Sequence, residues 1–145
     1  MPSLTIDPIT ATLGAEVSGF DMADVDDSTR DELRKAWLDY KVLVLRDQHV
    51  TIEEHIAFGR LFGELEVHPF VRNVEAHPEI IILESTPEAF GAAEVWHSDV
   101  TFRESPPLGS VLMGRIIPPY GGDTVWANQE LAYEQLPDDI KEEID

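Results

Sequence analysis

The sequence contains no cysteine, which excludes disulfide bonds, thiolate metal sites and cysteine nucleophiles. It also has no apolar run near the ~20 residues that a membrane-spanning helix needs. The opening residues, Met1 to Leu4, lack the basic and then apolar stretches of a signal peptide. Internal repeats and low-complexity tracts are absent as well. Together these absences favour a cytoplasmic protein.

Lysine is scarce, occurring only at Lys35, Lys41 and Lys141. Ten basic residues face 29 acidic ones, which gives a formal net charge of −19. Such a surface repels phosphate backbones and anionic lipid, so we expect neither nucleic acid nor membrane as a partner. The composition suits either a high-salt cytoplasm or an ordinary acidic protein, and it leaves a homo-oligomer open.

With 43% apolar residues in 145, the chain is long enough for one domain with a modest core. Helices are predicted over about 29–40 and 51–63, because Thr29 with Glu32 and Thr51 with Glu54 fit capping boxes. Two more are predicted after Asn128 and Pro137. Short apolar runs predict strands at 4–6, 11–13, 17–20, 42–45, 80–83, 95–102, 110–117 and 124–126. This order fits an α+β fold, or a β-barrel decorated with helices.

The central motif is Trp96-His97-Ser98-Asp99-Val100-Thr101-Phe102. On a strand, residues i and i+2 project from the same face with backbones about 7 Å apart, so His97 and Asp99 can converge on one ion. They would supply two corners of the facial triad that holds iron in non-haem oxygenases, and a distant histidine would supply the third. Taken alone, the motif is better explained by a simple His–Asp hydrogen bond on a strand surface, because a His-x-Asp pattern arises often by chance.

The residues around this motif resemble the taurine dioxygenase family, the TauD/TfdA-like Fe(II)- and 2-oxoglutarate-dependent dioxygenases. The resemblance extends over nearly the whole chain. Its blocks are Gly14 to Gly19, Val42 to Gln48, Trp96 to Phe102, Pro106-Pro107 and Gly121 to Trp126.

The resemblance implies a double-stranded β-helix (jelly-roll, cupin-like) core with flanking helices, incomplete at the C-terminus. Residues 1–145 would be the N-terminal part of a single dioxygenase domain. Fe(II) would be held by His97 and Asp99, with 2-oxoglutarate and O₂ as co-substrates. The third iron ligand and the arginine that pairs with 2-oxoglutarate are not found among these residues, so the segment alone is expected to be inactive.

Three further residues take roles from the same resemblance. Thr124 would donate a hydrogen bond to the distal carboxylate of 2-oxoglutarate, although Gly121 to Thr124 also reads as a plain hairpin turn. His68 and Val100 would contact the substrate, His68 as a donor to its anion. A surface or capping role for His68 stays open. The remaining histidines, His49, His55 and His77, are predicted to be surface residues.

Two positions depart from the taurine pattern. Val71 stands where taurine enzymes have a tyrosine, and Ala93 stands where they have an asparagine. A small zwitterion would lose two polar partners there, so we expect a bulkier organic anion: an alkylsulfonate, an alkyl sulfate or an aryloxyalkanoate. A hypothesis of another class is a truncated or degenerate jelly-roll module that binds without catalysis.

Overall fold

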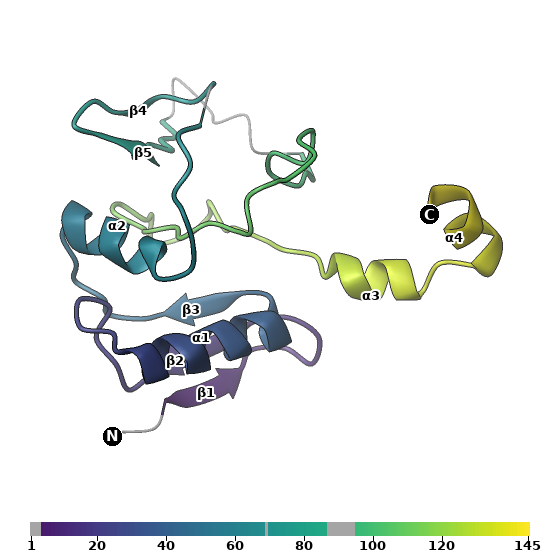
Figure 1. Ribbon diagram of the computed structural model, residues 1–145, viewed down its shortest axis with the longest axis horizontal. Helices are drawn as coiled ribbons and strands as arrows, with labels where there is room; N and C mark the ends of the chain where they lie inside the picture. Colours follow the sequence, from purple (N-terminus) through teal and green to yellow (C-terminus); the bar gives the residue numbers. More distant parts are fainter. Residues whose placement is uncertain (1–3, 69, 87–94) are drawn as a thin grey trace. The chain divides into compact units, whose positions relative to one another are not determined.

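The computed structural model describes residues 4–68, 70–86 and 95–145. The chain divides into two compact units: one comprises Met1–His49 with Gly114–Asp145, and the other comprises Val50–Met113. Each unit contains both helices and strands, so the class is α+β, as predicted (Figure 1). None of the helices in the described ranges is long and apolar enough to cross a membrane.

The first unit is organised around a three-stranded sheet of order β1-β2-β3. It comprises β1 (Thr5–Pro8), β2 (Ala15–Ser18) and β3 (Leu43–Leu45). The first two strands pair antiparallel, and β2 pairs parallel with β3. Ala15 and Val17 on β2 are fully buried while Glu16 between them is not, which is the period-two pattern of a strand with one face on the core.

Helix α1 (Asp27–Tyr40) covers this sheet and completes the core of the first unit (Figure 1). Leu33 and Ala36 are its buried residues. The predicted capping box of Thr29 and Glu32 is wrong, because the helix begins earlier: the N-cap is Asp26, whose carboxylate accepts the backbone N–H of Thr29 at 2.7 Å. That hydrogen bond holds the pKa of Asp26 below its usual value.

Helix α2 (Ile52–Arg60) opens the second unit, and its predicted capping box is confirmed. The Thr51 side chain accepts the Glu54 backbone N–H at 3.2 Å, and the Glu54 carboxylate accepts the Thr51 N–H at 2.7 Å. Ile56 and Phe58 are buried beneath the helix. A two-stranded antiparallel ribbon, β4 (Asn73–Val74) and β5 (His77–Ile81), follows in the same unit.

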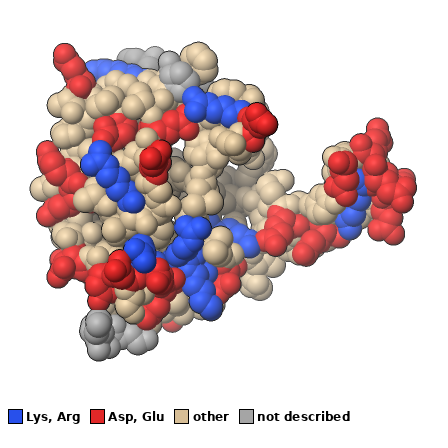
Figure 2. Space-filling model, in the orientation of Figure 1, with Lys and Arg blue, Asp and Glu red and all other residues tan. Residues whose placement is uncertain are grey.

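Two short helices, α3 (Gln129–Glu134) and α4 (Asp138–Ile144), belong to the first unit. Asn128 caps α3 as predicted, since its side-chain oxygen accepts the Leu131 N–H, and its amide group also donates to the carbonyl of Thr12 at 2.7 Å. Acidic side chains gather over these two helices (Figure 2). These two solvent-exposed helices therefore carry part of the net negative charge of the chain.

Several predicted strands do not form. The structure has no strand at 11–13, 95–102, 110–117 or 124–126, and the one expected at 80–83 lies at His77–Ile81. A strand needs hydrogen bonds from a neighbouring strand, and no described residue pairs with these segments in that way. Their apolar side chains stay exposed, among them Val95, Trp96, Phe102, Ile116, Ile117 and Val125. The sheets present are small and open.

Candidate functional site

His97 and Asp99 lie close together in the second unit. The Nε2 atom of His97 is 3.2 Å from Oδ1 of Asp99, and both side chains are more than half exposed. The other ring nitrogen, Nδ1, lies 2.8 Å from the carbonyl oxygen of Val95. Because a carbonyl only accepts, Nδ1 carries a proton and donates it. The lone pair of a neutral His97 is then on Nε2, the atom that faces the carboxylate.

This arrangement places two possible metal ligands side by side. The Nε2 atom of a neutral His97 and the Oδ1 atom of Asp99 both offer lone pairs, and they are 3.2 Å apart. Two atoms that ligate one ion at right angles with bonds of about 2.1 Å are themselves about 3 Å apart. The spacing of His97 and Asp99, and the backbone bond that fixes the ring tautomer, therefore fit neighbouring ligands of a divalent metal.

The backbone reaches this geometry by a turn and not by the predicted strand. Residues 99–102 form a turn, with the Arg103 N–H donating to the carbonyl of Val100 at 3.2 Å. Val100 has a φ of 54°, a left-handed conformation that strains a β-branched side chain and cannot continue a strand. The predicted convergence of His97 and Asp99 is thus present, but the same-face argument that led to it does not apply.

No third ligand joins the pair within the described residues, where no group of three or more His, Asp or Glu side chains is placed to hold a metal. His55 makes a different contact: its Nε2 atom is 2.9 Å from the carbonyl oxygen of Val111. His77 lies 3.5 Å from Glu53. His49 is exposed, as predicted, whereas His55 and His77 are half-buried.

His68 is half-buried in the loop after α2, and its ring is tied to the backbone that follows it. Nδ1 accepts the N–H groups of Phe70 and Val71, each at 3.2 Å. An atom that accepts must be unprotonated, so a neutral His68 carries its proton on Nε2 and can donate it to a ligand. Val71 is half-buried beside this turn, and Ala93 lies outside the described residues.

Thr124 belongs to the first unit, whereas His97 and Asp99 belong to the second. It lies exposed in irregular chain just after Gly121 and Gly122, which have φ values of 76° and 70°. Glycine adopts positive φ angles at little cost, so these two residues allow the chain to bend here. The strands predicted on either side, 110–117 and 124–126, are absent, so the predicted hairpin does not form.

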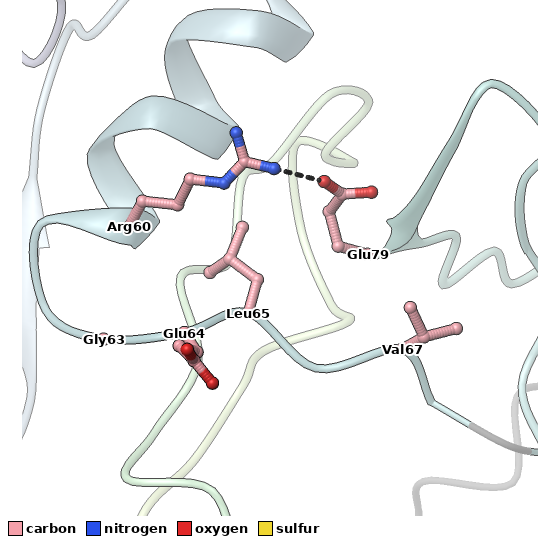
Figure 3. Close-up of a pocket in the computed structure, with 6 residues that line it drawn as sticks. All are labelled: Arg60, Gly63, Glu64, Leu65, Val67 and Glu79. Carbon is pink, nitrogen blue, oxygen red and sulfur yellow. Dashed lines mark hydrogen bonds and ion pairs between the residues drawn. The ribbon is translucent and has the colours of Figure 1, made fainter.

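A groove of about 560 Å³ in the second unit contains none of these residues. It lies between the end of α2, the loop that follows and β5, and is lined by Arg60, Gly63, Glu64, Leu65, Val67 and Glu79 (Figure 3). Arg60 points across it to Glu79, with a guanidinium nitrogen 3.0 Å from the carboxylate. This pairing occupies the cation that would otherwise attract an anionic ligand.

The segment after the His97–Asp99 motif is held by two tertiary contacts. The sequence did not predict either of them. His55 on α2 bonds to Val111, 56 residues away, and Arg103 forms an ion pair with Glu66 in the loop before His68. Neither pair has a local spacing signal, so only the folded chain identifies them. Both contacts restrain the segment that carries His97 and Asp99 against the rest of the second unit.

Residues 5–145 match the model of the family described as taurine catabolism dioxygenase TauD, TfdA family. The chain is 41% identical to an alkylsulfatase of Acinetobacter baylyi, over 96% of this chain and 44% of that relative. It is 34% identical to the (S)-phenoxypropionate/alpha-ketoglutarate-dioxygenase of Sphingobium herbicidovorans, over 99% of this chain and 52% of the relative.

Among solved structures, a taurine dioxygenase from Burkholderia xenovorans superposes with a TM-score of 0.84 at 40% identity. The match covers 99% of this chain and 51% of that structure. The chain therefore spans about half the length of the curated relatives and solved structures that it matches.

Proposed function

Because the chain belongs to the taurine catabolism dioxygenase TauD, TfdA family, we propose that it forms part of an Fe(II)- and 2-oxoglutarate-dependent dioxygenase. The observation that carries this proposal is the convergence of His97 and Asp99 at 3.2 Å, with the His97 tautomer fixed by Val95, inside a chain that matches the family model from residue 5 onward.

His97 Nε2 and Asp99 Oδ1 would hold the iron as two corners of a facial triad. Bound iron, 2-oxoglutarate and O₂ would supply the oxidising chemistry: decarboxylation of 2-oxoglutarate to succinate and CO₂, coupled to hydroxylation of a substrate C–H bond. The protein contributes position. The Val95 carbonyl orients the His97 ring, and the turn at 99–102 holds the Asp99 carboxylate beside it.

The remaining parts of the site would come from residues outside these 145. They are a third ligand, which we expect to be a histidine, and an arginine that pairs with the distal carboxylate of 2-oxoglutarate. Thr124 would donate a second hydrogen bond to that carboxylate. Residues 1–145 would then be the N-terminal part of one domain whose core, when complete, is a double-stranded β-helix that pairs the bare apolar segments at 95–126.

The substrate we propose is a small organic anion, hydroxylated at a carbon next to its sulfonate, sulfate or ether oxygen. His68, with a proton available on Nε2, would donate to the anion, and Val100 would contact the substrate from within the motif. The hydroxylated product would be unstable and would collapse to an aldehyde or ketone, with loss of sulfite from a sulfonate, sulfate from a sulfate ester, or an alcohol or phenol from an ether. Relatives described as an alkylsulfatase and a phenoxypropionate dioxygenase support this range of substrates.

The alternative, a module that binds without catalysis, has less support. The relatives matched over 96–99% of this chain carry enzyme names, and His97 and Asp99 lie close enough together to share one ion.

The direct test is to mix the complete protein with Fe(II), 2-oxoglutarate, O₂ and a panel of organic anions and to measure succinate. We expect succinate to form only with iron present and to rise when a suitable anion is added. Succinate formation that survives complete removal of iron by a chelator would contradict the proposal, as would its absence with every anion in the panel.

A further inference from the structure

Three aromatic rings form a connected row in the second unit. The His68 and Phe70 ring centroids are 6.3 Å apart with planes at 75°, and the Phe70 and Phe102 centroids are 6.5 Å apart with planes at 52°. We call these residues the three-ring cluster. Phe102 follows Asp99 by three residues in the same run of turns, so the cluster joins the loop at His68 to the proposed ligand motif.

The two arms of the cluster are held together by an ion pair beside it. Glu66 and Arg103 pair across the same two segments that bring Phe70 and Phe102 into contact. Both members of this ion pair are less than 40% exposed, so water screens them only in part. The contact between the Phe70 and Phe102 rings is therefore stabilised by a neighbouring ion pair as well as by the ring packing itself.

The position of Phe70 is also coupled to the hydrogen-bonding role of His68. The backbone N–H of Phe70 donates to His68 Nδ1 at 3.2 Å, and this bond leaves Nε2 as the donor. One turn of chain thus places an anion donor and an apolar ring next to each other. That combination suits a ligand with an anionic head and an apolar body.

Exposure separates this ring pair from an ordinary core pair. Phe70 is 81% exposed and Phe102 is 70% exposed. Phe58 and Phe62 also contact edge to face, at 5.3 Å, but Phe58 is only 4% exposed, so that pair serves packing beneath α2. Little of the described chain covers the rings of Phe70 and Phe102, and because Phe70 adjoins the His68 donor we assign their apolar surface to a substrate and not to the later strands of the domain.

From this geometry we propose that Phe70 is a specificity-determining residue, which with Phe102 binds the apolar group of the substrate while His68 binds its anion. The chemical class is an organic anion whose apolar group, aryl or alkyl, is larger than two carbons. The inference rests on the proposed function, because it assigns this surface to the substrate of that reaction.

The test compares the wild type with Phe70→Ala and Phe70→Leu in the complete protein. The substrates are ethanesulfonate, hexyl sulfate and phenoxyacetate. They compare a two-carbon anion, an anion with an alkyl chain and an anion with an aryl ring. Phe70→Ala should lower kcat/KM for the two larger anions by about ten- to hundredfold, mainly through KM, because burying the exposed phenylalanine ring against the substrate stabilises the complex on that scale. Ethanesulfonate should change less than about twofold, and Phe70→Leu should retain part of the preference.

A binding readout makes the result independent of turnover. Hexyl sulfate is titrated anaerobically into protein loaded with Fe(II) and 2-oxoglutarate, and its Kd should rise in Phe70→Ala by the same factor as KM. Tyr120→Ala removes an equally exposed ring, 87% exposed, from the other unit and should leave the preference unchanged. Thermal unfolding of each variant checks that the fold is intact.

Failure of the inference differs from failure of the proposed function. If the wild type forms succinate but Phe70→Ala affects all three anions equally, or none, Phe70 has no role in specificity and the inference is wrong while the dioxygenase stands. If the wild type forms no succinate with any anion, the proposed function is wrong and the inference falls with it.

Discussion

The Nε2 atom of His97 lies 3.2 Å from the Oδ1 atom of Asp99, although no strand places them on one face. A turn brings them together, and Val100 inside it adopts a φ of 54° that costs a β-branched residue free energy. Backbone strain of this kind persists only where other contacts hold it. The ion pair of Arg103 with Glu66 and the hydrogen bond of His55 to Val111 are such contacts.

Replacing either residue of this pair should abolish turnover. In His97→Ala and Asp99→Ala one of the two ligand atoms is gone, so we expect Fe(II) affinity to fall at least about tenfold and succinate formation to fall to background. Anaerobic Fe(II) titration and succinate measurement on the complete protein check this. His49→Ala removes an exposed histidine of the other unit and should change neither. Decarboxylation of 2-oxoglutarate retained by either variant would show that the pair does not bind iron.

Thr124→Val should weaken binding of 2-oxoglutarate and leave iron binding intact. One hydrogen bond to a charged group contributes roughly 1.5–3 kcal/mol, so the KM for 2-oxoglutarate should rise about ten- to hundredfold. Thr124→Ser keeps the hydroxyl and should stay close to the wild type. If the KM for 2-oxoglutarate is the same in Thr124→Val, the residue does not bind this co-substrate.

Taurine should be a poor substrate. Val71 and Ala93 offer no side-chain hydrogen bonds to a small zwitterion, and a buried ammonium or sulfonate without partners is costly. Succinate release should be compared for taurine, hexanesulfonate, a medium-chain alkyl sulfate and an aryloxyacetate at equal concentration. We expect taurine to rank last, and a clear lead for taurine would refute the argument from these two positions.

Residues 1–145 expressed alone should not catalyse. The described part of the chain offers two ligand atoms at the proposed site, and its apolar side chains at 95–126, such as Trp96 at 71% and Ile116 at 94% exposure, have no cover. Exposed surface of this kind promotes self-association. Sedimentation, thermal unfolding and a succinate assay test both parts. A monomer that unfolds cooperatively and turns over substrate would overturn the proposal that further residues are needed.

The sequence by itself determined the features that depend on neighbours within one helical turn. Thr51 with Glu54 at the start of α2 and Asn128 at the start of α3 were predictable, because a cap links residues three apart. The family resemblance and the proximity of His97 to Asp99 were also readable, since motif residues are close in the chain. The start of α1 was misplaced because Asp26 and Thr29 both offer a capping oxygen.

The strands predicted at 4–6, 17–20 and 42–45 formed near those positions, but only tertiary structure decided which of the other predicted strands form and which histidines make contacts. A strand is stabilised by hydrogen bonds to a partner strand that can be far away in sequence. The apolar runs at 95–102 and 110–117 predict strands, but they contain no information on whether a partner is present, and no described residue pairs with them. The bond from His55 to Val111 and the contact of Phe70 with Phe102 each join segments more than 30 residues apart. Such contacts leave no periodic trace in the sequence, because their free energy arises only when the chain has folded.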